Sequence, residues 1–378
     1  MKFVLFYHAI TSCWNNGNAH FLRGVARELA ALGHSVVVYE PGDGWSRRNA
    51  ILDGGTDTLA AARRVVSGVE VRQYDEPLDS MLDHALAGAD VVIVHEWNAP
   101  SLVTAIARRR AAGGAFTLLF HDTHHRAVTA PDQLSPHLDG FDAVLAFGEI
   151  LRDIYLKQGW ARRAFTWHEA ADTALFAPAE QASPTDDVVW IGNWGDDERS
   201  AEIAEYLIAP AATLRLSGSV FGVRYPEHAI AALRRCGLLY RGWLPNHAVA
   251  DAFAAARMTV HIPRGPYANA LPGIPTIRMF EALACGIPLI SAPWRDDEQM
   301  FPDGAYLRVS DRHAMREAMS AVLADRDLAA SLRQTGLAAI HARHTCRHRV
   351  NELMSMIRAI RGDRSQSAEP ALSGAVAP

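Results

Sequence analysis

Polar residues that can bind ligands or carry protons follow two apolar runs in the first half of the chain. The runs are Asp90–Val94 and Ala115–Phe120, each predicted to be a buried strand. The polar residues are His95, Glu96 and Asn98 after the first run, and His121 and Asp122 after the second. Parallel strands end at the same edge of a sheet, where ligands bind. We therefore expect one cluster able to hold a ligand and to transfer protons.

A second candidate is the stretch Gly273–Trp294. Pro275 and Thr276 mark the start of a predicted helix, which ends at Gly286 before a buried strand. Glu281 is an acid in a helix whose other side chains are mostly apolar. The free N–H groups of such a helix start, near Ile277, can hold an anion.

Further residues suit a phosphorylated ligand. Gly17, beside Asn18 in the first turn, allows a ligand to approach the backbone closely. Arg199 supplies a fixed positive charge at the start of a predicted helix. Together with the helix after Pro275 it suits a diphosphate, and Glu281 could accept hydrogen bonds from a ribose diol.

Strands and helices alternate along the chain, which predicts an α/β fold with doubly wound parallel sheets. Among the predicted strands are Phe3–Ile10 and Thr213–Ser217. The Ala-, Pro- and Ser-bearing segment near 172–186 is the predicted domain boundary. We expect a first domain over 1–172, a second over 187–345, a helix over 346–361 that could pack back on the first, and a disordered tail over 362–378.

Composition narrows the function. The 378 residues have 49% hydrophobic content, 21% charged residues and a net charge of −5, as in an ordinary globular protein with no general attraction to nucleic acid or anionic membranes. The 4 cysteines form no CxxC pair, which favours reduced thiols and a cytoplasmic location. No apolar run is long enough to span a bilayer. The histidines at 121, 124 and 125 lack a metal-ligand pattern, so no metal site is predicted.

The motifs resemble those of glycosyltransferases of the GT-B fold, in particular group-one (family 4) enzymes and their CgeB-like, spore-maturation relatives. The segment FEALACGIPLIS, from Phe280 to Ser291, is similar to their donor-site segment. Trp190–Trp194 with Arg199 resembles their first nucleotide-domain strand and phosphate-binding base, and Tyr240–Pro245 their loop at the nucleobase. Asn16-Gly17, Gly33-His34-Ser-Val, His95-Glu96-Trp97 and His121-Asp122 match motifs of the N-terminal half, so the resemblance covers about residues 1–361.

The resemblance implies two facing Rossmann-like domains with a cleft between them. It implies transfer of a hexose-type sugar from a UDP-, GDP- or dTDP-sugar to an acceptor hydroxyl on a small molecule, glycan or peptide, with retention and without a metal or cofactor. The implied catalytic residues are His121, Arg199 and Glu281. The implied donor-binding residues are Gly17, Arg199, Trp243, Leu244, Pro275, Thr276, Ile277 and Glu281, and the acceptor-side residues are Asn18, His95, Glu96, Asn98 and Asp122.

One departure from the family pattern leaves alternatives open. The family pairs Glu281 with a second glutamate, which contacts the donor sugar, but the corresponding residue here is Gly273. This absence supports one alternative, a non-catalytic GT-B partner subunit. A nucleotide-sugar epimerase of the same fold, which would act on the donor without an acceptor, is a second alternative. If the enzyme inverts configuration, Glu96 or Asp122 would have to deprotonate the acceptor.

Overall fold

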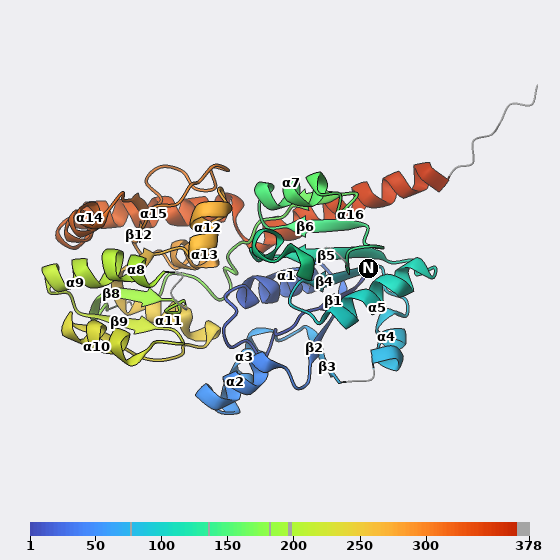
Figure 1. Ribbon diagram of the computed structural model, residues 1–378, viewed down its shortest axis with the longest axis horizontal. Helices are drawn as coiled ribbons and strands as arrows, with labels where there is room; N and C mark the ends of the chain where they lie inside the picture. The colour runs from blue at the N-terminus through green and yellow to red at the C-terminus, as the bar shows by residue number, and fades with distance from the viewer. Residues whose placement is uncertain (76–77, 135–136, 181–182, 196–198, 369–378) are drawn as a thin grey trace, which may run out of the picture.

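The computed structural model describes residues 1–378 apart from 76–77, 135–136, 181–182, 196–198 and 369–378. It has two lobes side by side, each built around one parallel sheet (Figure 1). The prediction of two doubly wound parallel sheets is confirmed.

The N-terminal sheet has the order β3-β2-β1-β4-β5-β6-β7 within the described residues. Its strands are β1 Lys2–Phe6, β2 Ser35–Pro41, β3 Glu70–Tyr74, β4 Val91–His95, β5 Thr117–Asp122, β6 Ala143–Ala146 and β7 Ala164–Thr166. Side chains of β1 alternate between two cores, with Phe3 and Leu5 on one face and Val4 and Phe6 on the other. Both faces are covered, which explains the continuous apolar runs in the sequence.

Helices cover both faces of this sheet. They are α1 Ala19–Ala31, α2 Trp45–Gly54, α3 Asp57–Val65, α4 Leu78–Leu86, α5 Pro100–Ala111, α6 Arg126–Thr129, η1 Pro131–Gln133 and α7 Glu149–Lys157. The strand order reverses between β1 and β4, and this switch point is where open parallel sheets bind ligands. The fold thus brings the ends of β1, β4 and β5 and the start of α1 to one edge.

The C-terminal sheet has the order β10-β9-β8-β11-β12-β13. Its strands are β8 Asp186–Ile191, β9 Gly218–Phe221, β10 Leu238–Tyr240, β11 Ala256–His261, β12 Leu289–Ser291 and β13 Leu307–Arg308. The helices are α8 Ser200–Ile203, η3 Ala204–Ile208, α9 Ala209–Leu214, α10 Glu227–Arg235, η4 Asn246–Ala248, α11 Val249–Ala254, α12 Gly265–Ala270, α13 Ile277–Ala284, α14 Arg312–Ala324 and α15 Arg326–Arg343.

Two strand predictions were wrong in position. The predicted strand Thr213–Ser217 is instead the end of α9 and a turn, and the strand β9 begins at Gly218. Arg215 ends the helix in a left-handed conformation, which the local sequence does not announce. The predicted strand Phe3–Ile10 stops at Phe6, and its last residues form the loop that leads toward α1.

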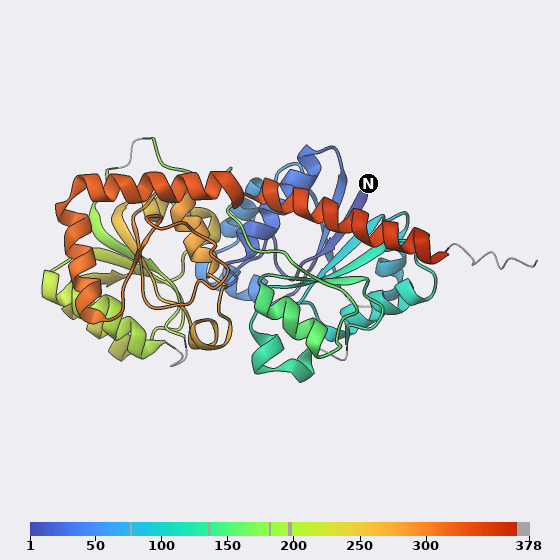
Figure 2. The ribbon, with the colours of Figure 1, turned by 90° about the horizontal axis from the view of Figure 1, so that it is seen from above.

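The last helix, α16 (Cys346–Ala368), returns from the second lobe and crosses the first (Figure 2). It packs on α1, where the Cys346 side chain lies against Gly24, and Arg361 donates to the Asp90 carbonyl oxygen at 2.7 Å. The helix continues into the predicted tail as far as Ala368, and residues 369–378 lie outside the described part.

A segment of the second lobe also enters the first. Leu271 and Ile274 are buried in the apolar core between the N-terminal sheet and its outer helices. Gly148, just before α7, has no side chain because Ile274 occupies that space: an added Cβ would lie 2.3 Å from Ile274 Cγ1. The lobes are therefore joined by a docked apolar plug as well as by α16.

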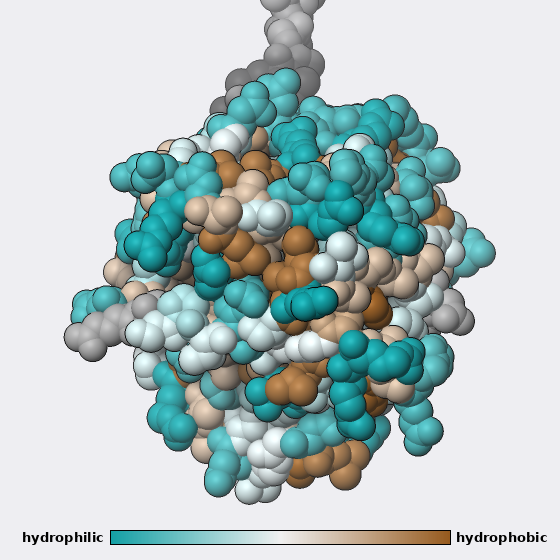
Figure 3. All heavy atoms as spheres, turned by 90° about the vertical axis from the view of Figure 1, so that its left-hand side faces the viewer, coloured by the Kyte–Doolittle hydropathy of each residue, from teal (hydrophilic) through white to brown (hydrophobic). Residues whose placement is uncertain are grey.

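The outer end of the C-terminal lobe shows hydrophilic side chains around its rim with apolar residues between them (Figure 3). Within the described residues, no helix combines the length and apolar character needed to cross a membrane.

Candidate active site

His121 lies where β5 ends, fully buried beside His95 of the neighbouring strand β4. Its ring centroid is 4.8 Å from that of Trp167 and 5.3 Å from that of His95. Burial lowers the pKa of His121 to about 3, so the imidazole is neutral at neutral pH. Neither ring nitrogen has a hydrogen-bond partner among the described residues. His121 is thus placed to offer a neutral donor or acceptor to a ligand.

Glu96 and Asp122 form a buried acidic pair at the same edge. Glu96 is bound by Arg126, whose Nε lies 3.1 Å from Oε2, and Asp122 accepts from the Tyr155 hydroxyl at 2.7 Å. Burial raises the pKa of both carboxyls, and the neighbouring Asp122 raises that of Glu96 further. Acids with raised pKa values can take part in proton transfer near neutral pH.

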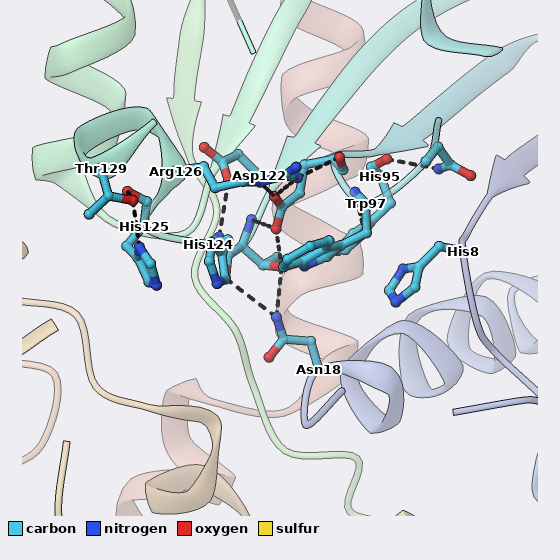
Figure 4. A network of polar contacts seen from close by, with 12 residues as sticks. His8, Asn18, His95, Trp97, Asp122, His124, His125, Arg126 and Thr129 are labelled. Carbon is cyan, nitrogen blue, oxygen red and sulfur yellow. Dashed lines mark hydrogen bonds and ion pairs between the residues drawn. The ribbon is translucent and has the colours of Figure 1, made fainter. Parts of the chain in front are cut away.

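The two predicted asparagines are already hydrogen-bonded, and Figure 4 shows Asn18 with its partners. Asn18, just before α1, donates to the Thr123 hydroxyl at 2.6 Å and so ties the first turn to the end of β5. Asn98 donates to the Phe6 and His95 carbonyl oxygens at 2.7 and 2.8 Å, which holds the ends of β1 and β4 together. His95 Nε2 also contacts the Thr123 hydroxyl, at 3.1 Å.

On the opposite side of the cleft, Glu281 is fully buried on α13. Its Oε1 lies 2.8 Å from His20 Nδ1 of the other lobe and accepts from Asn246 at 3.1 Å, while Oε2 pairs with Arg278. Burial by itself raises the pKa of Glu281, but Arg278 and His20 outweigh it, and the net pKa lies below the ordinary value. Glu281 is therefore an ionised carboxylate, and a ribose would have to displace one of these partners.

Arg199 lies at the switch point of the C-terminal sheet. It donates from Nε to the Asn193 carbonyl oxygen at 3.0 Å and from Nη1 to the Ile262 carbonyl oxygen at 3.2 Å, and its guanidinium lies over the Trp190 ring. It is half-buried, and these contacts hold its charge in place at the strand ends.

The start of α13 faces the first turn of the other lobe. Thr276 is the N-cap residue, as predicted, but its side chain caps no N–H group among the described residues. Pro275 is buried before it, and an added Cβ on Gly17 would lie 2.7 Å from Ile277 Cγ2. The absence of a side chain at Gly17 is thus what lets the turn approach the helix start.

A small cavity between the lobes brings together three of the eight predicted donor residues, Gly17, Trp243 and Leu244, and the other five do not line it. Its lining includes Gly17, Trp243, Leu244 and Arg278, and its volume is about 50 Å³. Ligand pockets are typically roughly 300–1,000 Å³. The lobes are therefore closed in this state, and a nucleotide sugar requires them to separate. The Trp243 indole, which donates to the Trp14 carbonyl oxygen at 2.6 Å, is one contact that must break.

The space that a side chain at Gly273 would occupy is taken by Glu298 of the same lobe. Gly273 has φ +89°, and an added Cβ would lie 2.6 Å from Glu298 Cγ. The Glu298 carboxylate accepts from the Glu149 backbone N–H at 2.8 Å and lies 2.6 Å from His168 Nε2, both across the cleft. A carboxylate is thus present beside Gly273, held by the other lobe.

Sequence reasoning did not identify several residues of this cleft, namely His20, Arg126, Glu169, Asn246, Arg278 and Glu298. Arg278 was recoverable, because it lies in the first turn of the predicted donor helix, three residues before Glu281. The others come from separate elements, and only the tertiary structure brings them to the site.

Comparisons with known proteins were made for the sequence and for the fold. Residues 199–355 match a family described as glycosyl transferase-like. A comparison of the sequence with curated proteins gives no match.

Three solved structures illustrate the fold likeness. A sucrose-phosphate synthase from Thermosynechococcus elongatus superposes with a TM-score of 0.66 at 15% identity, covering 96% of this chain and 100% of that one. HepE from Anabaena, solved with UDP and glucose, gives 0.64 at 12% identity over 95% and 100%. The β-glucosyltransferase of phage T4, solved with UDP and Mn²⁺, gives 0.59 at 12% identity over 95% and 99%.

The chain therefore has the GT-B fold, with two Rossmann-like domains. The likeness to solved structures establishes the fold, and the match over residues 199–355 relates the C-terminal lobe to glycosyl transferase-like sequences.

Proposed function

We propose that this protein is a nucleotide-sugar-dependent glycosyltransferase, retaining, of hexosyl type and nearest to the CgeB-like enzymes. One observation carries the proposal. In the C-terminal lobe, Arg278 lines the cavity between the lobes together with Gly17, and the Glu281 carboxylate that it pairs with reaches His20 of the N-terminal lobe. The structure of HepE with UDP and glucose supports a nucleotide sugar as donor.

In this proposal the C-terminal lobe stabilises the leaving diphosphate. Negative charge grows on its oxygens as the glycosidic bond breaks. Arg199 and the start of α13 at Thr276 and Ile277 supply fixed positive charge and N–H groups where that charge develops. These groups can act without a divalent metal, so metal independence is part of the proposal.

The N-terminal lobe then holds the acceptor, with His121 beside the sugar and Glu96 and Asp122 behind it. A retaining reaction needs no protein base, and the Glu96 carboxylate is already engaged by Arg126. A cytoplasmic location stays a prediction of the sequence.

The test is release of nucleoside diphosphate from UDP-, GDP- and dTDP-sugars, measured with a mixed panel of glycan, peptide and small-molecule acceptors. We expect release that depends on the acceptor and persists in EDTA, and an axial or equatorial anomeric NMR signal in the product that matches the donor. Conversion of the donor without any acceptor would instead favour an epimerase. No turnover of any donor would favour a non-catalytic partner subunit.

A further inference from the structure

The segment that joins the two lobes passes between the two halves of the site. It begins after β7 and is the green connection in Figures 1 and 2. At one end, the Trp167 ring lies 4.8 Å from that of His121. At the other end, the Ala170 carbonyl oxygen lies 3.2 Å from His20 Nε2, and His20 Nδ1 lies 2.8 Å from Glu281. Glu169 therefore sits between the predicted sugar contact and the predicted ribose contact.

Glu169 itself is 3% exposed. Its carbonyl oxygen accepts from Arg349 Nε of α16 at 3.3 Å, which fixes the backbone. Its side-chain Oε1, however, has no hydrogen-bond partner among the described residues. The two ring nitrogens of His121 share this condition. Buried polar atoms without partners cost stability, so these atoms indicate a ligand or water that completes them.

The pKa of the Glu169 carboxyl is also shifted. Burial raises the pKa of its carboxyl well above the ordinary range, and Glu281 from one lobe and Glu96 from the other raise it further. A raised pKa favours the protonated form of the carboxyl, which has a proton to donate. A neutral carboxyl both donates and accepts hydrogen bonds, which suits a sugar hydroxyl.

We propose that Glu169 binds a hydroxyl group of the transferred sugar through its carboxyl group, on the floor of the cleft between His121 and Glu281. This inference rests on the proposed function. The Glu298 carboxylate beside Gly273 is already engaged by the Glu149 N–H and His168, whereas Glu169 Oε1 has no hydrogen-bond partner among the described residues.

The test compares Glu169→Ala and Glu169→Gln with wild type by calorimetry. The probes are UDP-glucose, GDP-mannose and dTDP-glucose, each beside its free nucleoside diphosphate. Loss of one buried hydrogen bond predicts about tenfold weaker binding of the nucleotide sugar by Glu169→Ala, with the free diphosphate bound as tightly as by wild type. Glu169→Gln keeps a donor and an acceptor and should stay within about threefold. The control is Glu352→Ala, which removes the carboxylate that pairs with Arg349. It should change the binding of neither the nucleotide sugar nor the free diphosphate.

Thermal unfolding adds a second readout. Because an unpartnered buried carboxyl destabilises the fold, Glu169→Gln should melt no lower than wild type. Equal weakening of sugar and free diphosphate by Glu169→Ala would show a structural role and overturn the inference, as would unchanged binding of both. A Gln variant as weak as the Ala variant would show that a charged carboxylate is needed, and would also overturn it. If wild type binds none of the probes, the proposed function fails first.

Discussion

At the scale of single residues, the Glu281 carboxylate on the donor side already has hydrogen-bond and ion-pair partners within the protein. Glu281 holds three groups, from His20, Asn246 and Arg278, with no exposed atom. A donor must exchange its own hydroxyl and phosphate groups for these contacts. Because His20 belongs to the other lobe, separation of the lobes is what frees Glu281. The contact between His20 and Glu281 thus links donor binding at Glu281 to the separation of the lobes.

Arg278 is the cation of the small cavity, 27% exposed at its side chain and in the first turn of α13. We predict that Arg278→Ala weakens donor binding by about tenfold or more, because a charge-assisted hydrogen bond to a phosphate is lost. Titration calorimetry measures this. Arg295→Ala removes an exposed arginine from the same lobe and should leave affinity unchanged. Equal affinity of Arg278→Ala and wild type would remove Arg278 from the site.

The ionised state of Glu281 predicts how stability depends on pH. Its folded pKa lies below its unfolded value, so it stabilises the fold above the unfolded pKa, and this contribution is lost as pH falls toward the folded pKa. Urea unfolding below pH 5 should therefore show a steeper loss of stability for wild type than for Glu281→Gln. At pH 7 the variant should be less stable by about 3 kcal/mol, since it leaves Arg278 and His20 without a charged partner. Parallel pH curves would contradict the assignment.

At the scale of elements, apolar runs and helix boundaries were the most predictable features. The runs Asp90–Val94 and Ala115–Phe120 became β4 and β5, and the helix start at Thr276 is where it was expected. These features depend on local sequence. The start of β9 was misplaced because α9, which follows the π-helical turn η3, runs to Leu214 and so into the predicted strand Thr213–Ser217.

Only part of the candidate site could be predicted from the sequence, and the reason is physical. Strand-end residues such as His95 and His121 share an edge by topology, so the sequence suffices to group them. Glu169 and Glu298 reach the cleft through the connecting segment and a loop, and no periodicity marks them. The roles of such residues cannot be predicted from local sequence, because only the tertiary structure brings them to the cleft.

The plug formed by Leu271 and Ile274 predicts how the lobes close. The backbone at Gly148 is extended, with φ −168°, so alanine fits locally but collides with Ile274. We predict that Gly148→Ala favours the open state and lowers kcat by about tenfold, because overpacking costs the closed state about 1–3 kcal/mol. X-ray scattering of the free protein should show a larger radius of gyration. Gly44→Ala, where an added Cβ meets only ordinary contacts, is the control, and compactness of both variants like that of wild type would contradict the prediction.

At the scale of the whole molecule, two domains share one site that neither completes. The N-terminal lobe supplies Gly17, His121 and the acidic pair, and the C-terminal lobe supplies Arg199, Arg278 and Glu281. The helix α16 and the connecting segment fix how they meet, since Arg349 of α16 donates to the Glu169 carbonyl oxygen. A cavity of about 50 Å³ in this closed state makes opening a required step of ligand entry.

The most direct test of a nucleotide-sugar site between the lobes is a calorimetric titration of the full chain with UDP-, GDP- and dTDP-sugars. The account predicts saturable binding of at least one donor at one site, weakened about tenfold or more in Glu281→Ala, where the ribose contact is lost. The titration would contradict it if no donor binds wild type, or if Glu281→Ala binds the donor as tightly as wild type.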